Sequence, residues 1–320
     1  MKQKVLAWLG NGALVAGLIY CVLFAVYAGS EKGAVSLFSI ATLFNNAAPL
    51  ALAAAGETIV VLTKNFDLSV GGVISLTNVI LAVYPIPGPY GAAITILVVC
   101  LLGALVGAVN GALVAYGRLQ SIGATLGTMI VCQGLALVIL GAPGGNVSDF
   151  IANFFTDQIF GFPVAALVLL LVAFVWIILK TTDLGVAIYA IGQDEAAARL
   201  SGISVSRTRF LAYCLAGCVY ALAGFMLSAQ TATGNPTAGS SFSLLVFASV
   251  VIGGTSLLGG RGGLIGSMIG AAALTLLQKV LFSTGVESFY IGVFQGVIMI
   301  AALAFSETVF RVSRLGASSS

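Results

Sequence analysis

Residues 91–117 read GAAITILVVCLLGALVGAVNGALVAYG, a run without a single charged side chain. A helix of about 20 mostly apolar residues is long enough to cross the hydrocarbon core of a bilayer. This stretch therefore predicts a membrane-spanning helix. Within it Gly103, Gly107 and Gly111 recur every four residues, and small residues at that spacing form a flat stripe against which a second helix can pack closely.

The composition of the whole chain agrees with this reading. The chain has 320 residues, of which 60% are hydrophobic and only 7% charged, whereas soluble domains carry roughly 25% charged residues. A polytopic membrane protein is the class that such a composition indicates. The net charge of +3 and the lack of a basic run argue against binding to nucleic acid, and histidine is absent. Because the five cysteines also lack C-x-x-C spacing, neither a metal site nor a cofactor is expected.

Apolar runs along the chain predict an all-α protein with about ten membrane-spanning helices in a single transmembrane domain over residues 1–320. The first begins with basic residues, but it is too long for a signal peptide and is expected to remain as an uncleaved helix. The third and eighth are short and are expected to be broken or re-entrant. The ten expected spans are 5–28, 37–63, 68–84, 91–117, 122–141, 163–180, 208–230, 242–258, 263–283 and 289–310.

The basic residues orient these spans, because cytoplasmic loops carry an excess of Lys and Arg. With the N-terminus in the cytoplasm, the outer side receives only Lys32 and Lys279. The inner side receives Lys2, Lys4, Lys64, Arg118, Lys180, Arg199, Arg207, Arg209, Arg261, Arg311 and Arg314. Both termini and a loop at 181–207 are therefore predicted to be cytoplasmic, and a loop at 142–162 is predicted to lie outside.

The predicted cytoplasmic loop contains a helix signal of its own, Gly-Gln-Asp-Glu-Ala-Ala-Ala-Arg-Leu-Ser-Gly at 192–202. Asp194 can cap a helix start, the alanines propagate a helix, and Gly202 can end it in a left-handed conformation. A short capped helix on a polar loop indicates a partner protein on that side. The glycine-rich segment 253–263 lacks the lysine of a phosphate-binding loop. It is expected to be a tight turn, and the chain is expected to have no ATP site.

Polar side chains inside the expected spans are the candidates for a translocation path. Amides donate and accept hydrogen bonds, as sugar hydroxyls require, and aromatic faces cover C–H surfaces. The alternative is that these amides only join neighbouring helices. Two acidic residues receive other predictions: Glu57 is expected to pair with a nearby base, and Asp67 to cap the third span. The path candidates are Phe44, Asn45, Asn46, Asn78, Asn110 and Gln230.

Four motifs, in order and at similar spacing, resemble the membrane subunits of bacterial ABC importers for ribose, xylose, arabinose and related sugars. They are Asp67-Leu68-Ser69-Val70-Gly71, Thr125-Leu126-Gly127-Thr128-Met129, the segment 190–203 and the segment 251–262. The chain departs from the family's pattern in two places. Lys64-Asn65-Phe66 stands where the family usually has glycines, and Ile122-Gly123-Ala124 stands where it often has a proline.

The resemblance implies an inner-membrane permease subunit without enzymatic activity of its own. Two such subunits, identical or different, would form the pore within the lipid. Separate cytoplasmic ATP-binding subunits would drive alternating access, and a periplasmic or extracellular sugar-binding protein would deliver a pentose or hexose. The resemblance also implies a coupling helix that docks on the ATPase. Its residues would be Asp194, Glu195, Ala196, Ala197, Arg199 and Gly202.

Other solutes are compatible with the same loop. A nucleoside, a branched-chain amino acid or an autoinducer-type sugar would use a permease of similar design. An ion-coupled secondary transporter is disfavoured, because it would need a coupling-ion site near the midplane and no carboxylate is expected there.

Overall fold

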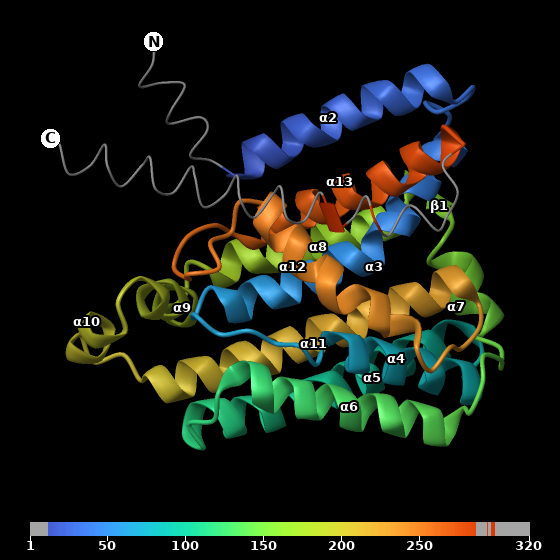
Figure 1. Ribbon diagram of the computed structural model, residues 1–320. Helices are drawn as coiled ribbons and strands as arrows, with labels where there is room; N and C mark the ends of the chain where they lie inside the picture. Colours follow the sequence, from blue (N-terminus) through green and yellow to red (C-terminus); the bar gives the residue numbers. More distant parts are fainter. Residues whose placement is uncertain (1–11, 286–292, 294–295, 298–320) are drawn as a thin grey trace, which may run out of the picture.

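The computed structural model of the chain describes residues 12–285, 293, 296 and 297. These residues form a bundle of helices with one short two-stranded hairpin (Figure 1). The expected tenth span at 289–310 falls almost wholly outside the described residues, as do the N-terminal residues of the expected first span.

Six helices are long and apolar enough to cross a membrane, which confirms a polytopic, multi-pass protein. They are α2 (Gly12–Ser30), α3 (Leu37–Val61), α5 (Gly88–Gly111) with its continuation η1 (Ala112–Tyr116), α6 (Ser121–Ile139), α11 (Val205–Thr231) and α13 (Leu264–Ser283). A seventh span results if α8 (Val164–Leu179) and α9 (Asp183–Gln193) are taken together, although they meet at an angle of 80°. The total of ten and the direction of insertion stay predictions.

The third and eighth expected spans are short, as the sequence predicts. They correspond to α4 (Val70–Val83) and to η2 (Ala238–Ser241) followed by α12 (Phe242–Ile252). At 1.5 Å per residue the 14 residues of α4 extend about 21 Å, less than the roughly 30 Å of a bilayer core. Such a segment is stable at membrane depth only when protein surrounds it, and α4 is buried over most of its length.

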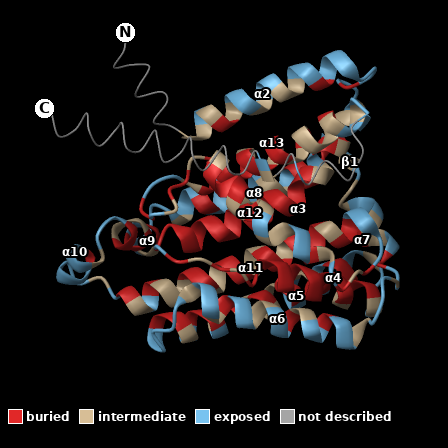
Figure 2. Cartoon of the chain, in the orientation of Figure 1, coloured by how far each residue is buried: buried red, intermediate tan, exposed pale blue. Residues whose placement is uncertain are grey.

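The centre of the bundle is the second half of α3, where every residue from Ala47 to Leu62 is buried. In Figure 2 this buried centre also includes α4 and α11, whereas α2 and α6 on the periphery expose many residues. Alanine is the commonest residue in the buried half of α3, and such small side chains let neighbouring backbones approach closely.

The glycine stripe of the fourth expected span marks the crossing of α5 and α11. A Cβ atom added at Gly103 would lie 2.1 Å from the Gly217 carbonyl oxygen, and one at Gly107 would lie 2.1 Å from the Tyr213 carbonyl oxygen. Both distances are too short for any side chain. The sequence prediction of a close helix crossing at this stripe is therefore confirmed.

The remaining elements lie at the two ends of the bundle (Figure 1). One end, here called the α10 end, carries α9 and the short helix α10 (Glu195–Leu200). The other, the α7 end, carries α7 (Asp149–Phe154) and the hairpin of β1 (Gln158–Ile159) and β2 (Phe162–Pro163). The glycine-rich segment 253–263 forms the predicted turn between α12 and α13.

Candidate functional site

Helix α10 begins and ends as its sequence predicts. The Asp194 carboxylate accepts hydrogen bonds from the backbone N–H groups of Ala196 (2.9 Å) and Ala197 (3.1 Å). Gly202 follows the helix in the left-handed region, with φ of +84°. A helix of six residues is far below the length that is stable alone in water, so contacts beyond the caps must hold it.

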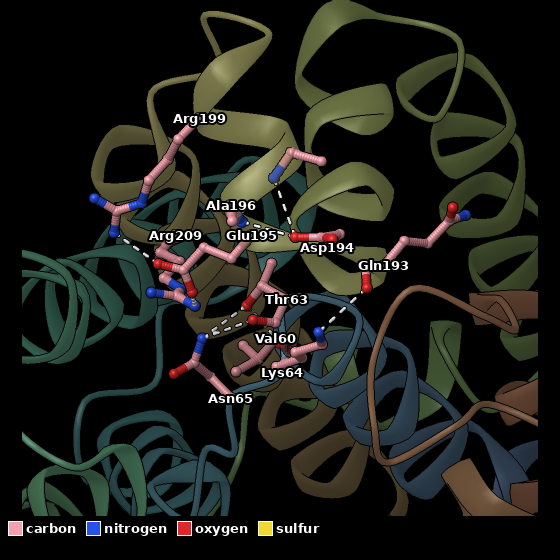
Figure 3. A network of polar contacts seen from close by, with 11 residues as sticks. Val60, Thr63, Lys64, Asn65, Gln193, Asp194, Glu195, Ala196, Arg199 and Arg209 are labelled. Carbon is pink, nitrogen blue, oxygen red and sulfur yellow. Dashed lines mark hydrogen bonds and ion pairs between the residues drawn. The ribbon is translucent and has the colours of Figure 1, made fainter.

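The Glu195 carboxylate supplies those contacts through two arginines (Figure 3). Its two oxygens lie 2.6 Å from the guanidinium nitrogens of Arg199, one turn along α10, and of Arg209, on α11. The Arg199 side chain is 59% exposed and that of Arg209 only 18%, so Arg209 is the shielded partner that fixes α10 to the end of α11. The hydrogen bonds from Arg199 and Arg209 hold the pKa of Glu195 below its usual range.

A second connection joins the residues before α10 to the end of α3. The Lys64 ammonium donates to the Gln193 carbonyl oxygen (3.3 Å), which is the last carbonyl of α9 (Figure 3). The Gly260 N–H donates to the Leu62 carbonyl oxygen (3.0 Å). A Cβ atom at Gly192 would lie 1.9 Å from that same oxygen and 2.3 Å from the Gly260 nitrogen. The ends of α3 and α9 and the glycine-rich turn thus meet at one junction.

Sequence reasoning missed both connections. Arg209 is separated from Glu195 by 14 residues and lies on a different helix, so no helical spacing relates them. For Lys64 the sequence predicts only a charge on the inner side, and it places α9 within a loop. The signal available for α9 is its apolar stretch GVAIYAI at 185–191.

Beneath this junction, the loop between α3 and α4 is held by a buried polar cluster. The Asp67 Oδ1 atom accepts from the Ser69 N–H (2.9 Å), the Ser69 hydroxyl (2.6 Å) and the Asn110 side-chain amide (3.3 Å). The prediction that Asp67 caps the third span is therefore wrong: α4 begins at Val70, and its N-cap residue is Ser69. Because the helix starts later than expected, Asp67 stays in the loop, where its carboxylate reaches Asn110 on α5.

Glu57 also has partners other than those predicted. Its carboxylate accepts from the Tyr220 hydroxyl (2.7 Å) and from the Asp67 N–H (3.1 Å), and the residue is fully buried. The prediction of a basic partner is wrong, because within the described residues the ion pairs involve only Glu195. No group of three metal-ligating His, Cys, Asp or Glu residues lies together in that part of the chain.

Five of the six path candidates lie near the α7 end, and four of these are not fully buried. The Gln230 amide on α11 donates to the Asn46 side-chain oxygen on α3, and the neighbouring Asn45 amide donates to the Thr156 carbonyl oxygen (2.7 Å). Phe44 precedes them with 36% of its surface exposed. Gln230 is exposed and Asn46 is half-buried, so this pair lies at the surface of the chain.

The other two candidates hold the bundle together. Asn78 on α4 is almost fully buried and bonded on every side: to the Ser228 hydroxyl, the Thr233 carbonyl and the Asn235 N–H. Asn110 lies at the opposite end, against the loop after α3. From Asn46 to the end of α3 is 15 residues, or about 22 Å along a helix. Asn110 therefore does not join the Asn46–Gln230 pair.

Comparison with known proteins places the chain among transport permeases. Residues 39–303 match the family described as the permease component of branched-chain amino acid transport systems. The chain is 36% identical over 291 residues to the ribose import permease of Haemophilus influenzae, covering 88% of this chain and 90% of the relative. It is 38% identical over 273 residues to the ribose import permease of Bacillus subtilis, covering 83% of each.

The autoinducer 2 import system permease of Escherichia coli O9:H4 is 31% identical over 304 residues, covering 94% of this chain and 89% of the relative. No solved structure matches the chain.

Proposed function

Because the chain belongs to the family of branched-chain amino acid transport system permease components, we propose that it is the membrane-spanning subunit of an ATP-driven importer for a monosaccharide. It resides in the inner membrane and crosses it several times. The resemblance to ribose permeases over most of the chain supports a pentose as the first choice. The likeness to an autoinducer 2 permease supports a sugar-like solute as the second candidate.

The observation that carries the proposal is the construction of α10. A six-residue helix outside the main bundle is capped by Asp194 and fixed to α11 through Glu195 and Arg209. These contacts couple it to α11, which packs against α3 at the centre of the bundle. A cytoplasmic ATP-binding subunit that displaces α10 would therefore displace α11 relative to α3.

The solute path of the proposal passes the Asn46–Gln230 pair at the α7 end. These amides lie on α3 and α11, the two helices that a movement of α10 would shift against each other. Amide groups exchange hydrogen bonds with sugar hydroxyls, and the partly exposed ring of Phe44 can cover an apolar sugar face. A soluble sugar-binding protein would deliver the solute at this end, next to α7 and the β1–β2 hairpin, and a second permease subunit would complete the pore.

The test uses the chain expressed together with ATP-binding subunits and a sugar-binding protein in bacteria that lack ribose uptake. The Glu195→Arg variant should lose ATP-dependent uptake of labelled ribose, because the new guanidinium would repel those of Arg199 and Arg209. The matched control is Asp183→Arg, at the start of α9 and outside α10. Unimpaired uptake by Glu195→Arg, at equal abundance in the membrane, would overturn the coupling assignment.

Direct uptake of different labelled solutes tests the substrate class separately. Labelled ribose, xylose, arabinose, a hexose, autoinducer 2 and leucine are each offered to the wild-type complex. Uptake of pentoses supports the proposal, and uptake of autoinducer 2 alone favours the second candidate. Uptake of leucine alone would refute a sugar permease, and the coupling test is then repeated with labelled leucine.

A further inference from the structure

Two carboxyl groups, those of Glu57 and Asp67, lie fully buried and adjacent where the loop between α3 and α4 enters the bundle. Neither forms an ion pair within the described residues. A buried charge without a partner of opposite sign is strongly destabilising, and a like charge nearby further disfavours ionisation of both groups. Either one carboxyl is neutral, or the cluster holds something that neutralises it.

The hydrogen bonds distinguish the two acids. Glu57 is satisfied as an acceptor, since one oxygen receives the Tyr220 hydroxyl and the other receives the Asp67 N–H. Asp67 is not: its Oδ1 atom receives three donors, while its Oδ2 atom is buried without any partner. The side-chain oxygen of Asn110 is likewise buried without a partner, although the amide nitrogen beside it donates to Asp67.

We propose that Asp67 is a proton-binding site, with the proton on Oδ2 donated to the side-chain oxygen of Asn110. The Asn110 amide already donates to Asp67 Oδ1, so the second hydrogen bond closes an acid–amide pair between two groups that already face each other. One hydrogen atom then satisfies both unpartnered atoms. Buried polar atoms without partners are rare in folded proteins, and here a single cause accounts for two of them.

Loss of this proton to water would leave two acceptors, a carboxylate oxygen and an amide oxygen, with no hydrogen between them. The loop between α3 and α4 would then lose one of its connections to α5. The same loop contains Lys64, whose ammonium donates to the last carbonyl of α9. Proton occupancy at Asp67 therefore sets how firmly the junction beside α10 is attached to the bundle.

The surroundings of Asp67 favour the neutral acid. The titratable groups that face it are Glu57 on α3, Cys132 on α6, and Tyr213 and Tyr220 on α11, and none of them is a cation. Burial raises the pKa of Asp67, which lies in the loop outside both helices, to about 6. The proton is therefore taken up as the pH falls from neutral toward mildly acidic values.

Infrared spectroscopy of the purified protein in lipid nanodiscs tests the assignment directly. The C=O stretch of a protonated carboxyl group should be present between about pH 5 and pH 6, where exposed Asp and Glu are ionised. Asp67→Asn should remove this band and Glu57→Gln should retain it. Absence of the band from the wild type, or its loss in Glu57→Gln with retention in Asp67→Asn, would overturn the proposal.

A stability comparison gives an independent readout. The amide introduced by Asp67→Asn keeps the acceptor oxygen and places an N–H donor opposite the Asn110 oxygen, and its second N–H is the only group added. The thermal midpoint of this variant at mildly acidic pH should therefore lie near that of the wild type. Asp67→Ala and Asn110→Leu, which each remove the pair, should melt at lower temperature. An Asp67→Asn variant that melts as low as Asp67→Ala, or that fails to fold, would contradict the proposal, because the isostere should preserve every hydrogen bond.

Discussion

Replacement of Gly107 by alanine tests the close crossing of α5 and α11. A Cβ atom at this position would lie 2.1 Å from the Tyr213 carbonyl oxygen, whereas ordinary contact begins at 3.4 Å. The backbones of α5 and α11 must therefore separate by roughly 1.3 Å, the difference of these distances, and overpacking of this kind costs about 1–3 kcal/mol. Even gaps of about 0.5–1 Å forfeit a quarter to a half of each dispersion contact, so the upper part of this range is expected.

The matched control is Gly134→Ala on α6, where an added Cβ atom meets nothing within 4 Å. The helix propensity of alanine favours both variants by about 1 kcal/mol, so the control should be neutral or slightly stabilised. Thermal unfolding followed by tryptophan fluorescence in detergent measures the difference. A net loss of about 2 kcal/mol corresponds to a midpoint lower by about 3 °C, because the unfolding entropy scales with the 320 residues of the chain. Equal midpoints for Gly107→Ala and Gly134→Ala would refute the close crossing.

Three further predictions concern α10 and the amide pair. Arg209→Ala should increase the rate of amide hydrogen exchange in α10 by roughly ten-fold or more, since a hydrogen bond to a charged group contributes about 1.5–3 kcal/mol. Arg199→Ala removes a more exposed ion pair, so it should change the same exchange rate by less than about three-fold. The pKa of Glu195 is lowered in the folded protein, so the ionised carboxylate stabilises α10 above its unfolded pKa of about 4.3, and this stabilisation is lost as the pH falls below that value. A spin label at Ser201 should become mobile at such low pH, and Glu195→Gln should abolish that pH dependence. Gln230→Ala should raise the KM for ribose uptake about two- to ten-fold through the loss of one neutral hydrogen bond. The control is Gln133→Ala, which removes an amide that donates to the Ser240 hydroxyl. Equal KM values for the two variants would show that Gln230 does not belong to the solute path.

Features that depend on neighbouring residues are predictable from the sequence. Apolar runs locate membrane helices because a bilayer imposes one requirement on every spanning segment, whatever lies beside it. The caps of α10 are predictable because an N-cap aspartate and a left-handed glycine act within a few residues. The glycine stripe of α5 predicts a close crossing, although it cannot identify α11 as the partner.

Features that depend on distant residues are beyond the same reasoning. The sequence favours a basic partner for Glu57 because charge pairing is a common solution for a carboxylate, yet its partner is the hydroxyl of Tyr220, 163 residues away. The five amide path candidates rest on polarity alone. Asn78 and Gln230 look alike by that criterion, although one is saturated by buried partners and the other is exposed.

The loop 62–69 explains how a displacement at α10 could reach three helices at once. At its start, the Leu62 carbonyl and the Lys64 ammonium contact the glycine-rich turn and the end of α9. At its end, Asp67 contacts Asn110 on α5 and, through its N–H, the carboxylate of Glu57 that is bonded to α11.

Lys64 holds this loop from a left-handed conformation, with φ of +64°, which a bulky side chain adopts only when its contacts compensate. Lys64→Gly should therefore remove the backbone strain at this position and also weaken the connection to α9. Its effect on thermal stability can thus be measured separately from its effect on coupling to uptake. The expected result is an unchanged or higher thermal midpoint together with slower ATP-driven ribose uptake at equal abundance in the membrane. Uptake at the wild-type rate would show that the Lys64–Gln193 contact carries no displacement from α9 to the loop, because the substitution removes that contact and leaves the backbone free to keep its turn.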